Sequence, residues 1–216
     1  MSTEIPIEGV KNLLIDFGGV LIDLDKERCL RAFEKIGVRG LENFLEDCHQ
    51  RGFLNDFECG RITVSEFCTH MREKACVKGA SPTDEEILAA WNHFLVGIPA
   101  YKLELLLRLR RHYRLLLLSN TNQAHWAWSC AQDFSWEGHR VEDFFDTIYL
   151  SFELHVEKPR PEIFERIIAD SGISSEETLF IDDSALNCEI GRSFGLRTYT
   201  PKPLEDWNKA LRLKVD

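Results

Sequence analysis

Acidic and hydroxyl side chains directly follow several short apolar runs of this sequence. Asp16 follows the first run, Ser119 closes the second, and the pair Asp182-Asp183 follows a later one, while Lys158 stands in a loop after another. In open α/β sheets, ligands bind beyond the carboxyl ends of the strands. If the apolar runs are strands of one sheet, these five side chains lie at the same edge.

Such a group of residues suits a metal ion and a phosphoryl group. Three carboxylates close together repel one another unless a proton or a cation intervenes, and Mg²⁺ is the natural choice because it prefers oxygen ligands. Asp16 could attack phosphorus and form an aspartyl phosphate. Lys158 would supply positive charge and Ser119 a hydroxyl donor, and the pair Gly18-Gly19 would let backbone N–H groups approach an oxyanion.

The pattern of apolar and polar residues predicts an α/β fold. Short aliphatic runs bounded by polar residues indicate buried parallel strands, here at 12–17, 113–118, 147–151, 178–181 and 196–199. Helical patterns separate them, at 99–112, 122–133, 161–171 and 185–194. Alternating strands and helices imply an open parallel sheet with right-handed crossovers.

One interval is too long for a simple crossover, which usually needs only a dozen or more residues. Residues 26–98 lie between the first and second strands and contain helical stretches at 26–36, 41–51, 64–76 and 84–96. Thr63 with Glu66 and Thr83 with Glu86 are predicted capping boxes. The sequence therefore predicts a helical subdomain inserted into the sheet domain.

Composition excludes several classes of protein. The chain has 216 residues, of which 44% are hydrophobic and 29% charged, as in ordinary globular proteins. No apolar run is long enough to span a bilayer, and the first residues show no secretory signal. We therefore expect a cytoplasmic protein with no membrane partner.

The net charge excludes some classes of binding partner, and the cysteines indicate the redox state of the thiols. A net charge of -10 argues against nucleic acid and anionic membranes. The seven cysteines are an odd number without a Cys-x-x-Cys pair, which indicates reduced thiols. Cys48-His49 with Cys68 and His70 fits no compact zinc site.

Four segments together resemble the four motifs of the haloacid dehalogenase-like superfamily. In chain order they are Leu14-Ile15-Asp16-Phe17-Gly18-Gly19-Val20-Leu21, Leu118-Ser119-Asn120, Lys158-Pro159 and Ile181-Asp182-Asp183. The resemblance implies a Rossmann-like core of residues 1–25 and 99–216. Residues 26–98 resemble the helical cap of one large subfamily, with residues 57–67 as the turn that dips toward the substrate, and such a cap closes over the site.

The resemblance also implies a role for each residue. Asp16 would be the nucleophile and a metal ligand, with the Gly18 carbonyl and Asp183 completing the direct ligands. Asp182 would be a more distant or water-mediated metal partner. The phosphoryl group would be bound by Ser119, Asn120 and Lys158, and Asn187 would complete the site.

One position departs from the family pattern. Most phosphatases of this family have a second aspartate two residues after the nucleophile, which protonates the leaving group, and here that residue is Gly18. Losing a general acid costs roughly 10² to 10⁴ in rate. Three explanations stay open: a good leaving group such as a sugar 1-phosphate or acyl phosphate, a proton from Asp23, Asp25 or the cap, or a slow or inactive relative.

We predict a Mg²⁺-dependent phosphatase of a small phosphorylated metabolite, a monomer or weak homodimer. We favour a sugar 1-phosphate, because the Asp-x-Gly-Gly-Val pattern with Ser-Asn-Thr-Asn at the second motif resembles hexose-1-phosphate phosphatases. The alternative is a phosphate-binding or regulatory protein with little turnover. The acidic pair Asp182-Asp183 argues against a dehalogenase, and Gly18 argues against a phosphomutase.

Two further groups of side chains, one aromatic and one polar, could contact a substrate. The aromatic side chains after the second motif are more typical of core packing than of a sugar platform; they are Trp126, Trp128, Phe134 and Trp136. Polar residues of the helical insertion are candidates for specificity; they are His49, Arg51, Asn55, Glu58 and Arg61.

Overall fold

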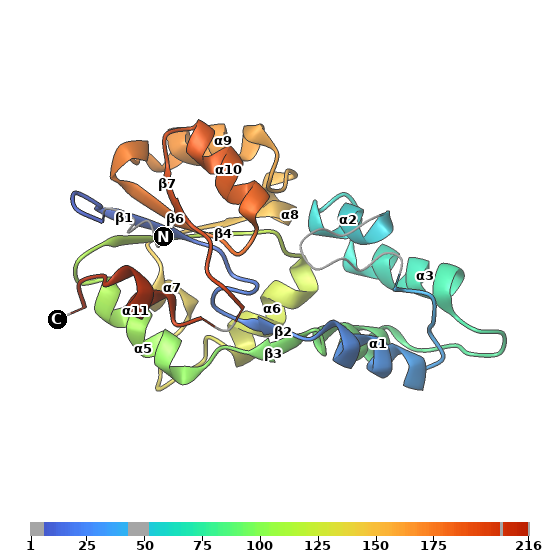
Figure 1. The fold of residues 1–216 in the computed structure, drawn as a ribbon. Helices are drawn as coiled ribbons and strands as arrows, with labels where there is room; N and C mark the ends of the chain where they lie inside the picture. The colour runs from blue at the N-terminus through green and yellow to red at the C-terminus, as the bar shows by residue number, and fades with distance from the viewer. Residues whose placement is uncertain (1–6, 43–51, 204, 216) are drawn as a thin grey trace.

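A five-stranded parallel sheet lies at the centre of the protein (Figure 1). The computed structural model describes residues 7–42, 52–203 and 205–215. The strand order is β5-β4-β1-β6-β7, with β1 Asn12–Ile15, β4 Arg114–Ser119, β5 Thr147–Leu150, β6 Thr178–Ile181 and β7 Arg197–Tyr199. All five predicted strands are present, with ends that differ by no more than two residues. The predicted α/β fold with a Rossmann-like parallel sheet is confirmed.

Both faces of the sheet are buried, which explains why its strands are continuous apolar runs. Successive side chains of a strand point to opposite faces, so Leu13 and Ile15 of β1 pack into one hydrophobic cluster and Leu14 packs into another. Helices α9 and α10 cover the Leu14 face, and α5, α7 and α11 cover the other (Figure 1).

The helices around the sheet connect its strands. They are α5 Ala100–Leu109, α6 Gln123–Gln132, α7 Val141–Phe144, α8 Ser151–Leu154, α9 Pro161–Ser171, α10 Ala185–Ser193 and α11 Trp207–Leu211, with a 3₁₀ turn at Ser175–Glu177. Gly172 ends α9 with a left-handed φ of 65°, a conformation that favours glycine. Within the described ranges, no helix has both the length and the apolar character needed to cross a membrane.

Four more helices lie beyond the carboxyl edge of the sheet, at the right of Figure 1. They are α1 Lys26–Lys35, α2 Phe53–Glu58, α3 Val64–Ala75 and α4 Asp84–Asn92. The predicted capping boxes at Thr63 and Thr83 are both formed. A short antiparallel pair, β2 Asp23–Leu24 with β3 Leu95–Gly97, joins these helices to the sheet domain.

Of the helices predicted in this region, one is shorter in the structure and another lies mostly outside the described ranges. The helix predicted at 84–96 ends at Asn92, and its last residues form strand β3. The backbone there pairs with the chain entering the insertion, because the Asp25 N–H donates to the Phe94 carbonyl. The helix predicted at 41–51 falls on residues of which all but Leu41 and Glu42 lie outside the described ranges.

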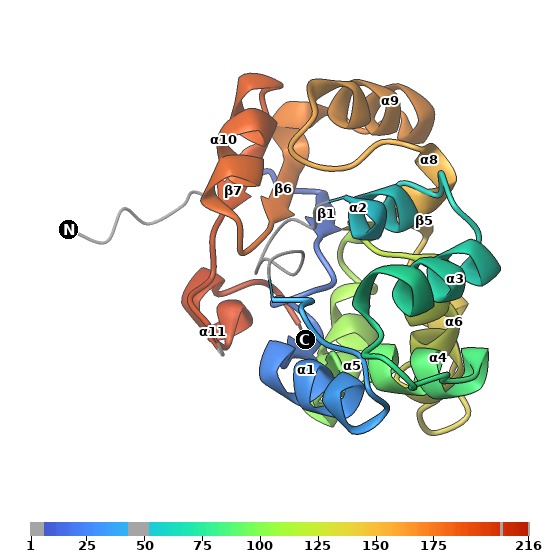
Figure 2. The same ribbon diagram turned by 90° about the vertical axis from the view of Figure 1, so that its right-hand side faces the viewer.

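Buried contacts attach the four helices to the sheet domain. The ring of Trp91 on α4 stacks on His125 of α6 at 4.6 Å between centroids, and Trp91 Nε1 donates to Asn122 Oδ1. Figure 2, seen from the side of the insertion, shows α2 next to α8, and residues of the two helices are in contact. The division into a core of residues 1–25 and 99–216 and a cap of residues 26–98 remains our proposal.

Candidate active site

The carboxyl edge of the sheet brings most of the predicted residues to one small cavity of about 70 Å³. Its lining consists of Asp16, Gly18, Leu24, Glu58, Phe94, Asn120, Lys158, Asp183, Ser184 and Asn187. Ser119, Gly19 and Asp182, which were predicted with them, are not part of this lining.

Lys158 is almost completely enclosed in the site, with 1% of its surface exposed. Its Nζ lies 2.6 Å from Asp16 Oδ1 and 2.6 Å from Asp182 Oδ2, and it donates to the Leu118 carbonyl at 3.0 Å. Burial alone would lower the pKa of Lys158, but the two carboxylates outweigh burial and raise it. The ammonium group therefore remains charged between the ends of β1, β4 and β6.

Asp16 has one oxygen fixed and one available. Its Oδ1 accepts from the Phe17 N–H at 2.8 Å and contacts Lys158. No hydrogen bond from the described residues reaches its Oδ2. Burial raises the pKa of Asp16 to about 8, helped by Asp182 and Asp183 and opposed by Lys158. Its unbonded Oδ2 can attack an electrophile or bind a cation once the carboxyl group is ionised, a form that Lys158 and a bound cation favour.

The neighbouring residues Asp182 and Asp183 differ in burial and in hydrogen bonding. Asp182 is fully buried and has both oxygens engaged, because Oδ1 accepts from the Ser184 N–H at 2.9 Å and Oδ2 contacts Lys158. Asp183 instead is exposed and lines the cavity. Burial first, and then Asp182, raise the pKa of Asp183. The arrangement favours Asp183 as a direct metal ligand and Asp182 as the residue that positions Lys158.

The side chains around the cavity carry a net negative charge that a divalent cation could neutralise. Carboxylate oxygens of Asp16, Asp182 and Asp183 lie within 4.8 Å of one another. Three carboxylates and the single ammonium of Lys158 leave two excess negative charges, which a Mg²⁺ ion would neutralise. Throughout the described ranges, no other group of three or more His, Cys, Asp or Glu side chains is arranged to hold a metal.

Asn187 completes this set of polar groups. Its Nδ2 donates to Asp182 Oδ1 at 2.9 Å. Its Oδ1 is buried and accepts no hydrogen bond from the residues the structure describes. The oxygen is therefore available for a donor inside the cavity, such as a water bound to the metal.

Asn120 of the second motif has a backbone partner that the sequence did not predict. The Asn120 amide pairs with the backbone of Lys158, accepting from its N–H at 2.8 Å and donating to its carbonyl at 2.9 Å. Asn120 therefore holds the Lys158 loop in place, and the second hydrogen of its Nδ2 is left for a ligand in the cavity that Asn120 lines. The Ser119 hydroxyl is buried and lies 3.4 Å from the Asn120 carbonyl.

The glycine pair also differs in part from the prediction. The Gly19 N–H donates to the Ile22 carbonyl at 2.9 Å, so it does not face an oxyanion. Glycine is needed at 19 because φ is 71° and a Cβ atom would lie 2.1 Å from Asp183 Oδ2. At Gly18 a Cβ atom would lie 3.1 Å from Leu24 Cδ1, and no acid occupies that place.

The acids that follow the first motif have other partners. Asp25 caps helix α1 by accepting from the Arg28 N–H, and Asp23 lies 3.7 Å from Lys102 Nζ. Neither residue is in the lining of the cavity around Asp16. Asp25 is therefore occupied as a helix cap, and Asp23 lines an adjoining cavity, where it lies near Lys102.

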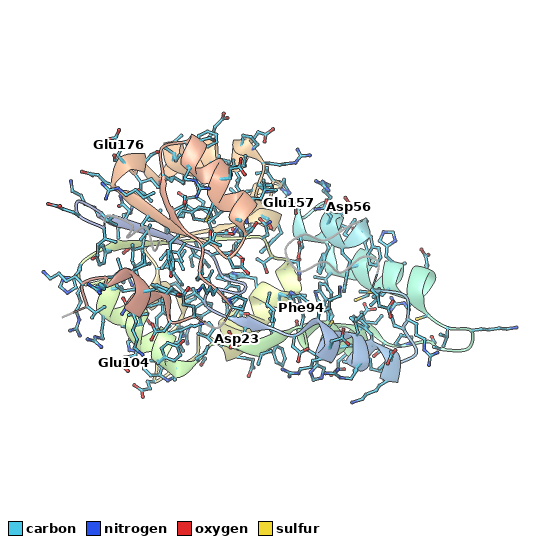
Figure 3. All side chains as sticks on the ribbon, in the orientation of Figure 1. Asp23, Asp56, Phe94, Glu104, Glu157 and Glu176 are labelled. Carbon is cyan, nitrogen blue, oxygen red and sulfur yellow. The ribbon has the colours of Figure 1, made fainter. Side chains whose placement is uncertain are left out.

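Helix α2 of the insertion is seated tightly on the sheet domain. Asn55 Nδ2 donates to Glu157 Oε1 at 2.6 Å, and the Glu58 carbonyl accepts from Ser151 Oγ at 2.6 Å. Figure 3 shows Glu157 at this junction, close to Asp56. At Gly60, where φ is 63°, a Cβ atom would lie 2.1 Å from the Phe152 carbonyl oxygen. The close approach of the two parts thus depends on glycine at position 60.

Sequence reasoning missed the apolar part of the cavity. Leu24 and Phe94 belong to the antiparallel pair β2-β3 and its flank, which only long-range pairing reveals. Of the polar residues proposed for specificity, Glu58 lines the cavity, whereas Arg61 pairs with Asp56. His49 and Arg51 lie outside the described ranges.

The aromatic residues after the second motif are mainly core residues. Phe134 is fully buried and stacks on Phe17, and Trp126 meets Phe17 edge to face. Trp128 is 41% exposed. None of these side chains is in the lining of the cavity, so the interpretation as core packing fits better than a sugar platform.

The sequence was compared with known protein families and curated proteins. Residues 10–195 match the family described as haloacid dehalogenase-like hydrolase. A D-ribitol-5-phosphate phosphatase of Bacteroides thetaiotaomicron is 38% identical over 202 residues, which are 94% of this chain and 97% of that protein.

The fold was compared with solved structures. One similar structure is an aspartate-to-alanine mutant of a HAD family enzyme of Bacteroides thetaiotaomicron in complex with magnesium and inorganic phosphate. Its TM-score is 0.90 at 48% identity, covering 94% of this chain and all of that one. A predicted HAD-like family hydrolase of Porphyromonas gingivalis has a TM-score of 0.85 at 37% identity, covering 94% of this chain and 96% of that one.

Replacing Gly60 with alanine should prevent α2 from seating. The new Cβ atom would collide with the Phe152 carbonyl, and the left-handed backbone would add strain of about 1 kcal/mol. We expect the specificity constant kcat/KM to fall about a hundredfold, since a shift of about 1 Å suffices for such losses. Steady-state kinetics and urea unfolding measure the two effects.

Gly79→Ala is the matched control. Gly79 also has a positive φ, 92°, but a Cβ atom there would meet nothing within 4 Å. Gly79→Ala should lose about as much stability from backbone strain as Gly60→Ala does, and it should keep nearly full activity. Equal activities of the two variants would show that the contact of Gly60 with Phe152 is unimportant.

Proposed function

This chain belongs to the haloacid dehalogenase-like hydrolase family, and on that premise we propose that it is a Mg²⁺-dependent phosphatase of a small sugar or polyol phosphate. The observation that carries the proposal is the state of Asp16. One oxygen is fixed by Lys158 and the Phe17 N–H, and the other is available in a small cavity that the carboxylate of Asp183 also lines.

In the proposed reaction, Asp16 Oδ2 attacks phosphorus and forms an aspartyl phosphate, while the bond from phosphorus to the leaving oxygen breaks. Water then hydrolyses the aspartyl phosphate and releases phosphate. Lys158 keeps Asp16 oriented and places positive charge next to the transferring group. Asn120 acts through Lys158, by holding the backbone of that residue.

Asp16, Asp183 and the Gly18 carbonyl are the groups that would hold Mg²⁺. When bound, the ion neutralises charge that builds up on the phosphoryl oxygens. The magnesium complexes of the similar Bacteroides thetaiotaomicron structures support this assignment.

The substrate class follows from the relative and from the cavities. The name D-ribitol-5-phosphate phosphatase points to a terminal phosphate of a polyol, whose alkoxide is a poor leaving group. This differs from the sugar 1-phosphate favoured by the absence of an acid at Gly18. A second cavity of about 290 Å³ adjoins the first and shares Leu24, Phe94 and Asp183 with it. We propose that the polyol or sugar part extends into this second cavity.

Mg²⁺ should stabilise the protein measurably through Asp183. At a Mg²⁺ concentration a hundred times its Kd, ligand linkage adds about 2.7 kcal/mol to the free energy of unfolding. We expect Mg²⁺ to raise the Tm of the wild type in a thermal melt and to leave the Tm of Asp183→Asn unchanged. Glu176→Gln makes the same change of charge on the exposed surface far from the site (Figure 3), and it should respond like the wild type.

Asp16→Asn should abolish turnover. Removing a covalent nucleophile costs about 10⁴-fold or more, because the amide cannot form the phosphoenzyme. The measurement is Mg²⁺-dependent release of phosphate from D-ribitol 5-phosphate, with thermal melting to verify the fold. A wild type no faster than Asp16→Asn on every sugar phosphate tested would support the binding or regulatory alternative instead.

The substrate class can be tested with two monoesters. We expect the wild type to have a higher kcat/KM for D-ribitol 5-phosphate than for D-glucose 1-phosphate. If D-glucose 1-phosphate were preferred by more than about tenfold, the leaving-group argument from Gly18 would be right and the polyol assignment wrong.

A further inference from the structure

A phosphatase acting on an alkyl phosphate needs a proton donor for the leaving oxygen. The position two residues after Asp16 is Gly18 and supplies none. Asp25 caps α1, and Asp23, which lines the second cavity, lies 3.7 Å from Lys102 Nζ and is not in the lining of the cavity around Asp16. The donor must therefore come from another group that lines the cavity. This inference rests on the phosphatase function proposed above.

Of the titratable side chains that line the cavity, one has no role in the reaction proposed above. Lys158 is held by three acceptors, Asp16 is the proposed nucleophile and Asp183 a proposed metal ligand. The remaining described residues of the lining, apart from Glu58, are apolar or neutral; they are Gly18, Leu24, Phe94, Asn120, Ser184 and Asn187. Glu58, at the end of α2, is the only acid left.

The position of Glu58 is fixed by the core. Its carbonyl accepts from Ser151 Oγ at 2.6 Å, and the next carbonyl, that of Cys59, is 3.1 Å from His155 Nδ1. One turn earlier, Asn55 donates to Glu157. These three contacts tie the end of α2 to α8 and to the loop that carries Lys158.

The carboxyl group of Glu58 is in a state that suits an acid. The residue is 8% exposed, and its carboxyl group has no hydrogen-bond partner among the described residues. Burial, and then the charge of Glu157, raise the pKa of Glu58 to about 8. The other charged groups of the lining are Asp16, Asp183 and Lys158. A carboxyl group with this pKa is mostly protonated at pH 7 and can donate.

We propose that Glu58 is the general acid and base of this enzyme, delivered to the reaction by the helical insertion. In the first step, Asp16 Oδ2 forms a bond to phosphorus, the bond to the leaving oxygen breaks, and the Glu58 proton passes to that oxygen. In the second step, the Glu58 carboxylate removes a proton from water, whose oxygen attacks phosphorus. The bond between phosphorus and Asp16 breaks, phosphate leaves, and Glu58 is protonated again.

Glu58→Gln tests this role with two leaving groups. With D-ribitol 5-phosphate, the alkoxide needs the proton, and we expect phosphate release to fall by about 10² to 10⁴. With 4-nitrophenyl phosphate, the phenolate leaves without a proton. A stopped-flow trace should therefore show a burst of about one 4-nitrophenolate per active site at nearly the wild-type rate. Slow turnover should follow, because no base activates water for the second step.

Two further variants separate chemistry from structure. Asn55→Ala removes one of the three contacts of α2, while the contacts of Glu58 and Cys59 with α8 keep the Glu58 carboxyl group in the cavity, so any loss of rate should be small and equal for both substrates, without a burst. Glu58→Asp keeps a carboxyl group and should recover part of the activity on D-ribitol 5-phosphate.

The outcomes distinguish this proposal from the proposed function. If Glu58→Gln lowers the rates on both substrates equally without a burst, or leaves the alkyl phosphate unaffected, while Asp16→Asn is inactive, then Glu58 is not the acid and the phosphatase assignment stands. If the wild type hydrolyses neither ester faster than Asp16→Asn, the phosphatase assignment itself fails.

Discussion

The buried ammonium of Lys158 is the interaction on which the site depends. It lies 2.6 Å from carboxylates at the ends of β1 and β6 and donates to the last-but-one residue of β4. A buried carboxylate is costly unless it is paired and hydrogen-bonded, so Lys158 makes it possible for Asp16 and Asp182 to remain side by side. The further contacts of Asn120 and Asn187 serve the same end, because one fixes the Lys158 backbone and the other binds Asp182.

The sheet was predictable because its strands are buried on both faces, which leaves runs such as Leu115 to Leu118 in the sequence. The same rule places the carboxyl ends of parallel strands at one edge, so the sequence alone predicts that Asp16, Lys158 and Asp183 lie close together. The pair β2-β3 was not predictable. It has two and three residues, too few for a pattern, and exists because residues 23–24 meet residues 95–97 across the whole insertion.

The hydrogen-bond partners of individual atoms in the site could not be predicted from the sequence. The amide of Asn120 can bind a phosphoryl group or a backbone, and only the folded loop shows that it binds the backbone of Lys158. Gly19 was expected to expose an N–H and instead makes space for Asp183 Oδ2. In both cases the sequence correctly indicated that the residue belongs to the site, but the partner of each atom is a property of tertiary structure.

Placing the acid on the insertion rather than beside the nucleophile has a consequence for the reaction. An aspartate at position 18 would be present whether the insertion is seated or not. Glu58 lines the cavity of Asp16 only when α2 rests on α8, which requires the close contact of Gly60 with Phe152. The same contact buries Glu58 and so raises its pKa toward the range of a useful proton donor. Seating of the insertion would then assemble the catalytic groups and exclude bulk water in a single movement, so that an unseated enzyme could bind phosphate without protonating an alkoxide.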